Sequence, residues 1–275
     1  MITHLVRTRL LGDALVGNTL AGHWRGGVGL LIRNANYHGA NVAILVSGFV
    51  EPLLYLLSLG VGMGQLVDQV TYRGIALDYA VFVAPAMLAT AAMNGTVTET
   101  TYNFFSKLKF MKLYHGIIAT PVTPLGIVLG EVAWAVVRGA MYAACFVIVM
   151  AAMGLTPSWW AIAAFPAAVL IGLAFATVGL ALTTYMRSWQ DFDYIAVSTF
   201  LLLLFSGTFA PLDVYPTWLQ VIIMATPLYH GVELIRGLTT GMVSVGLWGH
   251  VAYLLVVSAA GLVVAGGRMR RLLTP

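Results

Sequence analysis

The sequence predicts an all-α integral membrane protein with six transmembrane helices, an N-terminal amphipathic surface helix and external re-entrant helices between spans five and six. Of its 275 residues, 60% are hydrophobic and only 9% are charged, against about 25% charged residues in an ordinary soluble domain. The mean hydropathy is +0.90. A water-soluble chain of this length could not bury so much apolar surface, and a disordered chain carries far less of it. The composition therefore excludes both classes.

Six apolar segments approach or exceed the roughly 20 helical residues that a bilayer core requires. Backbone groups in lipid must hydrogen-bond within the protein, so each segment is expected to be a helix. The segments cover residues 41–64, 79–97, 125–153, 159–186, 194–210 and 247–267. We expect one domain over residues 1–275, with a cytoplasmic segment at 1–40, the six-helix domain at 41–267 and a cytoplasmic tail at 268–275.

The lysines and arginines predict the orientation, because short cytoplasmic loops are enriched in both. With the N-terminus inside, only Arg73 and Arg236 fall outside, and Arg138 lies within a span. The other eleven fall inside: Arg7, Arg9, Arg25, Arg33, Lys107, Lys109, Lys112, Arg187, Arg268, Arg270 and Arg271. Both termini are therefore expected in the cytoplasm, with the protein in the inner (plasma) membrane. This split also explains the net charge of +4, so no nucleic-acid partner is expected.

A helical stripe precedes the first span. Apolar residues recur at helical spacing, which predicts one apolar helix face: Trp24, Val28, Leu31, Ile32 and Ala35. Arg25 and Arg33 flank the stripe. The pattern is typical of an amphipathic helix on the cytoplasmic membrane surface. A plain linker remains the alternative, because three glycines weaken an isolated helix here.

The stretch 211–246 contains an apolar run that is too short to cross the membrane. Trp218 begins this run between Pro216 and Pro227, and Pro211 opens the stretch. If the run crossed, the basic C-terminal tail would lie outside. We interpret the stretch as two short helices that dip into the outer leaflet and are broken at Pro227. An apolar external loop packed on the spans is the alternative.

Two intramembrane charges are predicted to reach a similar depth. Glu51 lies ten residues into the first span and Arg138 lies in the third, two turns above Glu131. Buried ionisable residues are costly in lipid and face protein or water. We expect Glu51 and Arg138 to pair across the two helices, either as a lock between them or as part of a substrate path.

No recognisable catalytic or metal-binding arrangement of residues is found in the sequence. The single cysteine, Cys145, and six scattered histidines show no metal-ligand spacing. No Gly-x-x-x-x-Gly-Lys-Ser/Thr loop is present, so ATP binding by that route is excluded. We expect no catalytic residue, metal or cofactor in this chain.

Four segments resemble the permease subunits of ABC-2-type (ATP-binding cassette) transporters. They are Glu51-Pro52 with the following residues to 64, 84–89 leading to Glu99, 119–122 with Gly130-Glu131, and 205–220 with 227–237. The first-span and Glu99 segments are most similar to nodulation lipo-oligosaccharide exporter permeases and antibiotic-resistance permeases. The resemblance covers nearly the whole chain from residue 41 onward.

The resemblance implies a coupling helix at about 112–120, in the loop from Glu99 to Pro124, that contacts a partner ATPase. Its residues are Lys112, Leu113, Tyr114, His115, Gly116, Ile117, Ile118 and Thr120. It also implies re-entrant helices at 211–237 and a dimer with a second copy or a sister permease. ATP and Mg would bind to two separate ATPase subunits.

The function implied is ATP-driven export of an amphipathic, lipid-linked or drug-like substrate by alternating access. The path would lie at the dimer interface and be lined by the first, second and fifth helices. Polar and hydroxyl residues are assigned to this path, with helix-packing contacts as the alternative role: Ser47, Thr90, Asn94, Thr98, Ser198, Ser206 and Thr208. The alternative is a six-helix channel or membrane-embedded enzyme without ATPase partners.

Overall fold

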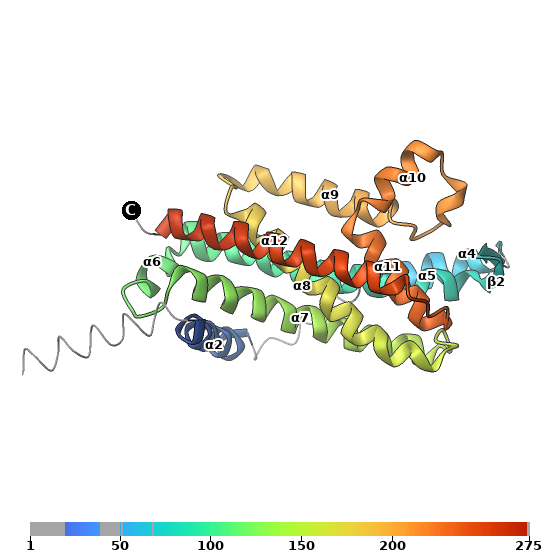
Figure 1. Cartoon of the computed structure of the whole chain (residues 1–275), viewed down its shortest axis with the longest axis horizontal. Helices are drawn as coiled ribbons and strands as arrows, with labels where there is room; N and C mark the ends of the chain where they lie inside the picture. Colours follow the sequence, from blue (N-terminus) through green and yellow to red (C-terminus); the bar gives the residue numbers. More distant parts are fainter. Residues whose placement is uncertain (1–19, 39–49, 51, 68, 274–275) are drawn as a thin grey trace, which may run out of the picture.

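Helices form nearly all of the chain in the computed structural model, which describes residues 20–38, 50, 52–67 and 69–273 (Figure 1). The α-helices are α2 (Leu20–His38), α4 (Gly62–Gly64), α5 (Tyr79–Thr98), α6 (Leu113–Ile117), α7 (Pro124–Ala152), α8 (Ala164–Thr183), α9 (Phe192–Leu204), α10 (Thr217–Met224), α11 (Pro227–Thr240) and α12 (Leu247–Leu273). Short π-helical segments are η1 (Leu56–Val61), η2 (Glu99–Asn103) and η3 (Ser106–Phe110). Short 3-10 helices are η4 (Trp159–Ala163), η5 (Trp189–Asp191) and η6 (Leu212–Val214).

Within the described residues, four helices are long and apolar enough to cross a membrane, or five if a bent pair counts as one span. They are Tyr79–Phe110, Pro124–Ala152, Trp159–Thr183 and Leu247–Leu273. The six predicted spans are therefore not confirmed. The first predicted span, 41–64, falls partly on residues outside the described ranges. Its described part contains a shorter apolar helix, Pro52–Gly64. The predicted fifth span, 194–210, contains only α9, which ends at Leu204.

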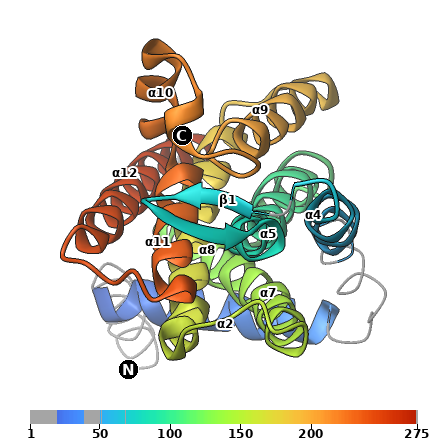
Figure 2. The same ribbon diagram turned by 90° about the vertical axis from the view of Figure 1, so that its right-hand side faces the viewer.

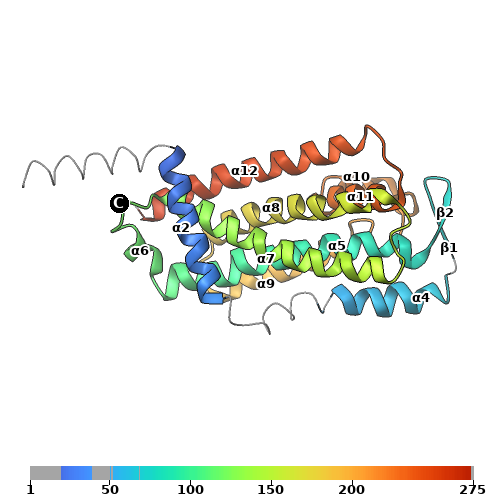
Figure 3. The same cartoon turned by 90° about the horizontal axis from the view of Figure 1, so that it is seen from below.

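The long helices run roughly side by side and give the molecule two different ends (Figures 1 and 3). We name the end with α2, α6 and the C-terminus the basic end; α12 finishes there with Arg270 and Arg271. The opposite end carries a β-hairpin and is named the hairpin end. Basic side chains suit a helix C-terminus because they offset its negative dipole end.

The helix that begins with α5 continues much further than the sequence predicts. It runs from Tyr79 through η2 and η3 to Phe110, a length of 32 residues. The predicted loop beginning at Glu99 is therefore wrong for its first twelve residues, Glu99 to Phe110. The charges at Glu99 and Lys107 do not end the helix, because both side chains are buried and neutralised by ion pairs.

The hairpin corrects the all-α prediction. Strands β1 (Gln69–Tyr72) and β2 (Ile75–Asp78) pair antiparallel, with Tyr72 opposite Ile75. Arg73 and Gly74 form the turn with φ values of 50° and 81°. Positive φ at both central residues is the geometry that matches the twist of two strands. A β-branched and aromatic run before a glycine was the signal in the sequence.

The helix pair α10 and α11 confirms the predicted break at Pro227. The two helices are bent by 84°. Thr226 caps α11 by accepting a hydrogen bond from the Tyr229 amide at 3.4 Å, and Pro227 takes the first helical position. Residues 231–239 of α11 are all buried, against α5, α8 and α12. Dipping of this pair into the outer leaflet stays a prediction.

Helix α2 lies crosswise against the end of the bundle, as Figures 2 and 3 show. It contacts α7 at a glycine crossing: a Cβ on Gly130 would lie 2.7 Å from the Leu30 Cβ and 2.8 Å from the Gly27 carbonyl oxygen. The helix is thus stabilised by packing rather than by its own propensity.

The side of α2 that packs on the protein differs from the predicted apolar stripe. Its buried residues include Gly27, Leu30 and Asn34. Trp24 is 61% exposed and Ile32 55% exposed, and Arg25 and Arg33 are also exposed while Val28 and Leu31 are half-buried. The exposed apolar side chains Trp24 and Ile32 are available to a membrane surface, so the surface-helix interpretation stays a prediction.

Candidate functional site

Four buried charged residues meet at the basic end and form a cluster that we name the interlock: Glu99, Lys107, Glu131 and Arg138. The Lys107 ammonium lies 2.8 Å from Glu131 Oε2 and 3.4 Å from Glu99 Oε1. Arg138 pairs with Glu99 and donates a hydrogen bond to the Tyr142 hydroxyl at 2.9 Å. Two acids and two bases give the cluster no net formal charge, which allows its burial.

The sequence places these residues on facing sides of two helices. Glu99 lies in η2 and Lys107 in η3, two turns further along the same continuous helix. Glu131 and Arg138 are seven residues apart on α7 and share one face. Asn103 donates a hydrogen bond to Glu99 Oε2 at 2.7 Å, which fixes the carboxylate. The π-helical turns rotate these side chains relative to a regular α-helix, and such turns are frequent at functional sites.

The interlock also contacts the surface helix. Lys107 donates to the Asn34 side-chain oxygen at 3.5 Å, so α2 is joined to the same ammonium group as α7. Asn34 is only 2% exposed. A displacement of α2 would therefore alter a buried charged bond between the two spanning helices.

The segment predicted to be a coupling helix, 112–120, contains α6, a five-residue helix entered through Lys112, and its contact with an ATPase stays a prediction. Lys112 has φ 47°, a left-handed conformation that turns the chain sharply after Phe110. Lys112, His115, Gly116 and Thr120 are exposed, whereas Leu113, Ile117 and Ile118 are half-buried. The exposed residues form the part of this segment that another protein can reach.

Tyr114 faces inward rather than toward a partner. It is fully buried, and its ring lies 5.3 Å from that of Phe104. Within the described residues its hydroxyl has no hydrogen bond of acceptable geometry. Burial, and next the nearby Glu131 carboxylate, raise the Tyr114 pKa well above its ordinary value. The tyrosine therefore anchors α6 above the interlock.

A comparison with family models identifies the chain. Residues 31–239 match the model described as "ABC-2 type transporter". The chain belongs to the ABC-2 type transporter family. The family is one of membrane transport components.

Curated relatives of this ABC-2 transporter chain cover most of its length. Nodulation protein J of Rhizobium leguminosarum bv. trifolii is 32% identical over 233 residues, 84% of this chain and 87% of the relative. Nodulation protein J of Rhizobium leguminosarum bv. viciae is 30% identical over 234 residues, 84% of this chain and 88% of the relative. The Rhizobium meliloti (strain 1021) protein of the same name is 30% identical over 237 residues, 85% and 88% of the two chains.

Only one member of the predicted intramembrane pair, Arg138, lies among the described residues. Glu51 and Ser47 lie outside the described residues, so the Glu51–Arg138 pair stays a prediction. The described partners of Arg138 are Glu99 and Tyr142. The sequence reasoning missed Glu99 and Lys107 as intramembrane partners because it placed both in a loop. Their separation of eight residues, close to two helical turns, was an available signal.

The predicted pathway residues divide into two groups in this ABC-2 transporter chain. Thr90, Ser206 and Thr208 are buried within it, and the Thr90 hydroxyl donates to the Ala86 carbonyl of its own helix at 2.9 Å. Asn94 is half-buried, while Thr98 and Ser198 are exposed. Asn94 and Thr98 lie one turn apart on one face. Thr98 is the only exposed residue of α5, and a pathway role for this face stays a prediction.

A second buried charge cluster lies at the hairpin end and was not predicted. Glu233 on α11 accepts a hydrogen bond from the Tyr72 hydroxyl at 2.5 Å and pairs with Arg73 at 2.9 Å and with Arg236 at 3.0 Å. Arg236 also donates to two main-chain carbonyls, of Phe82 at 3.1 Å and of Gly207 at 2.8 Å. Arg236 was predicted on the external side, in the stretch interpreted as re-entrant helices, and its side chain is 1% exposed.

The remaining predicted residues of the external stretch lie around the helix break. Pro211 and Pro227 are half-buried, while Pro216 is exposed and Trp218 is 66% exposed. Trp218 is on α10, which projects away from the long helices in Figure 2. An exposed tryptophan beside a membrane-spanning bundle suits the lipid interface.

An aromatic cluster connects the interlock helix to α9. Phe110 stacks on Trp189 of η5 with ring centroids 5.4 Å apart, and Trp189 lies 5.2 Å from Phe192 at the start of α9. Phe105 contacts both of the latter rings, at 5.4 and 5.1 Å. Movement of η3 is thereby linked to the base of α9.

Proposed function

We propose that the chain is the membrane-spanning subunit of an ATP-driven exporter in the cell inner membrane. Two separate ATPase subunits would bind ATP and Mg, and a second copy or a sister permease would complete the dimer. The basic end would face the cytoplasm, in accord with its lysines and arginines. The first and fifth predicted spans would complete six crossings, with both termini cytoplasmic.

The interlock is the observation that carries this proposal. It joins three elements that a cytoplasmic motor would act on: α2, the helix leading into α6, and α7. A motor can move the transmembrane helices only if two requirements are met. The contacts that transmit the movement must be stiff, and the helices must have two alternative packings. Buried charged contacts among these elements would supply the first, with Lys107 lying 2.8 Å from Glu131, 3.4 Å from Glu99 and 3.5 Å from Asn34. Exchange of partners among them would supply the second.

The exposed face of α9 supports a substrate path between two permeases. Val197, Phe200 and Leu201 are 58, 53 and 47% exposed. A 13-residue helix with so much apolar surface requires lipid or another protein against it. A second permease here would place α9 and the Asn94–Thr98 face beside the pathway.

The cargo class rests on the relatives. Those reported are named Nodulation protein J, and the sequence segments resemble permeases for lipo-oligosaccharides and antibiotics. We therefore assign an amphipathic, lipid-linked or drug-like substrate.

Charge reversal on the exposed surface of the coupling segment tests the ATPase contact. The double variant Lys112→Glu and His115→Glu should fold normally, because both side chains are exposed. It should lose ATPase co-purification or ATP-dependent transport in vesicles. Arg271→Glu, an exposed charge reversal at the same end, serves as the control and should keep both.

Two results would contradict the proposal. One is unchanged co-purification and coupling in the double variant, which would remove α6 as the contact. The other is transport that persists without ATP or any ATPase subunit. That outcome would instead support a channel.

A further inference from the structure

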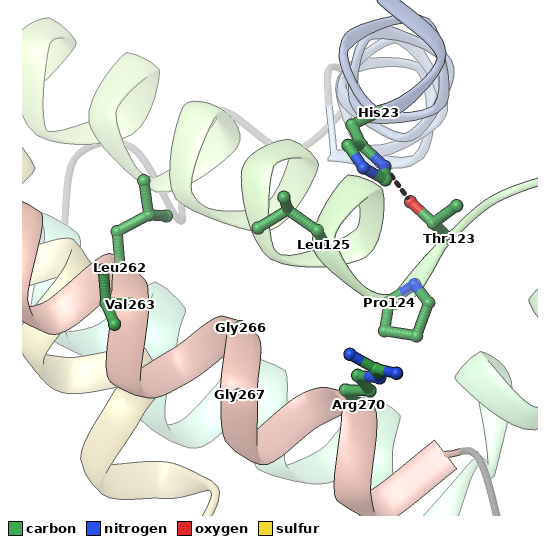
Figure 4. Close-up of a pocket in the computed structure, with 9 residues that line it drawn as sticks. All are labelled: His23, Thr123, Pro124, Leu125, Leu262, Val263, Gly266, Gly267 and Arg270. Carbon is green, nitrogen blue, oxygen red and sulfur yellow. Dashed lines mark hydrogen bonds between the residues drawn. The ribbon is translucent and has the colours of Figure 1, made fainter. Parts of the chain in front are cut away.

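A groove at the basic end lies between α2, α7 and α12, away from the residues assigned to the pathway. It has a volume of about 720 Å³ and is drawn in Figure 4. The lining residues come from all three helices: His23, Thr123, Pro124, Leu125, Leu262, Val263, Gly266, Gly267 and Arg270. This volume falls within the roughly 300–1,000 Å³ that is typical of small-molecule sites.

The groove is amphipathic along its length. Arg270, His23 and Thr123 gather at one end of it, while Leu262 and Val263 lie toward the other (Figure 4). The polar end coincides with the last turn of α12, where Arg271 follows Arg270. The apolar end lies further toward the middle of the same helix.

The position of the groove in the membrane follows from α12. This helix is long enough to cross, and only 22% of its most apolar stretch is buried. Most of its surface is therefore available to lipid. Its basic last turn marks the level of the headgroups, where arginines attract anionic lipids.

Glycines keep the groove open. A Cβ on Gly267 would meet no atom within 4 Å, and one on Gly266 would meet only the Leu125 side chain, at 3.2 Å. The wall of α12 thus lacks two side chains at the centre of the groove. The His23 ring, bonded to the Thr123 hydroxyl at 2.6 Å, closes the opposite side.

We propose that this groove binds one anionic phospholipid of the leaflet at the basic end. The headgroup phosphate binds Arg270, beside His23, and an acyl chain lies along Leu125, Leu262 and Val263. Zwitterionic lipid gains less, because its own ammonium group competes with the arginine. Since α2 and α12 form opposite walls, the lipid connects the surface helix to the last span.

The charge requirement is tested by native mass spectrometry of the full chain in neutral detergent. Titration with phosphatidylglycerol should show one preferred site per chain, and phosphatidylcholine should bind more weakly. Arg270→Gln should weaken phosphatidylglycerol binding about fivefold, as expected for one arginine at a membrane surface. Arg271→Gln is the matched control, an exposed arginine of the same turn outside the groove lining, and should change it less than about twofold.

The shape requirement is tested by filling the groove. Gly267→Leu adds a side chain into the groove and should abolish the preferred site. Gly249→Leu is the matched control, because Gly249 lies on the same helix and also meets no atom within 4 Å. Both substitutions favour the helix to the same degree, so a difference between them reports the groove.

Four outcomes would overturn the proposal. The first is equal binding of phosphatidylglycerol and phosphatidylcholine. The second is an equal loss in Arg270→Gln and Arg271→Gln, which indicates surface charge alone. The third is unchanged binding in Gly267→Leu. Displacement of the lipid by excess inorganic phosphate would assign the site to a free anion instead. None of these results depends on export or on an ATPase.

Discussion

The two buried charge clusters differ in what holds their cations. At the hairpin end, Arg236 donates to the main-chain carbonyls of Phe82 and Gly207 and to Glu233 on its own helix. At the basic end, the described hydrogen bonds of Lys107 and Arg138 all go to side chains on other segments or turns. One cation is bound to the backbone, and the others are bound to groups that can rotate.

This difference separates a fixed joint from an exchangeable one. Main-chain carbonyls move only with their helices, so the Arg236 bonds hold α11, the start of α5 and the 205–211 loop in one arrangement. Side-chain carboxylates can exchange partners through rotamer changes. Under the proposed function, such exchange would provide the alternative packings of similar energy that alternating access requires. The predictions below test this distinction.

The largest effect is expected from Glu233→Ala. The substitution leaves Arg236 buried without its carboxylate, and removal of one partner from a buried pair costs about 3–5 kcal/mol. The free energy of unfolding, measured by denaturant titration in detergent, should fall by that amount. Arg73→Ala is the control: that side chain is 46% exposed, so its loss should cost about 0–1 kcal/mol. Equal losses of unfolding free energy in Glu233→Ala and Arg73→Ala would mean that the buried pair with Arg236 stabilises the protein no more than the exposed pair with Arg73.

A double-mutant cycle at the interlock should show a smaller loss of unfolding free energy, and the second substitution should restore most of it. Lys107→Met leaves the buried Glu131 carboxylate unpaired, at a cost of about 2–3 kcal/mol. Combination with Glu131→Gln should recover most of the loss in unfolding free energy while transport stays impaired. Additive losses, or normal transport in the double variant, would argue against an exchangeable joint.

Trp189→Ala should weaken the link between η3 and α9. The indole contacts Phe105, Phe110 and Phe192 at 5.2–5.4 Å between ring centroids. Loss of these contacts and of the buried area should cost about 2 kcal/mol. Thermal unfolding measures this, with Trp160→Ala as a control because Trp160 lies in η4 and is 51% exposed. A larger loss of thermal stability in Trp160→Ala than in Trp189→Ala would show that the Trp189 contacts are not an important link.

Tyr72→Phe should have the smallest effect and a characteristic pH dependence. Burial, then the Glu233 charge, raise the Tyr72 pKa above its ordinary value. Because the folded pKa is raised, this contribution to stability is complete below about pH 10 and is lost as pH rises further. At neutral pH the variant should lose about 1 kcal/mol.

The pH dependence of unfolding measures the same residue independently. Between about pH 9 and 11, the unfolding temperature of the unchanged protein should fall faster than that of Tyr72→Phe. Parallel curves would mean that the hydroxyl does not join the hairpin to Glu233. The hairpin end would then depend on Arg236 alone.

Apolar segments alone predicted much of the helical framework. The spans at 125–153 and 247–267 correspond to α7 and α12 because the backbone of a long apolar run must hydrogen-bond within the protein in lipid, and a helix achieves this within one segment. The break before Pro227 and the exposed Trp218 were also predictable, since proline chemistry is local. The family resemblance located α6 within three residues of its expected end.

Longer-range pairing was not predictable from local patterns. Glu99 and Lys107 read as loop residues until Glu131 and Arg138, more than twenty residues away, are placed beside them. Likewise, Arg236 reads as an external charge until the carbonyls of Phe82 and Gly207 surround it. The protein-facing side of α2 depended on Gly130 of α7, and no periodicity within α2 reports that contact.

The sequence by itself determined that this chain lies in a membrane, which end is basic and where several helices run. These properties follow from the cost of exposing polar backbone and charge to lipid, and that cost accumulates residue by residue. Only the tertiary structure decided which charges are buried, which partners neutralise them and where a lipid-sized groove remains. Those properties depend on which distant segments meet, because the energy of a buried charge is set by its neighbours in space.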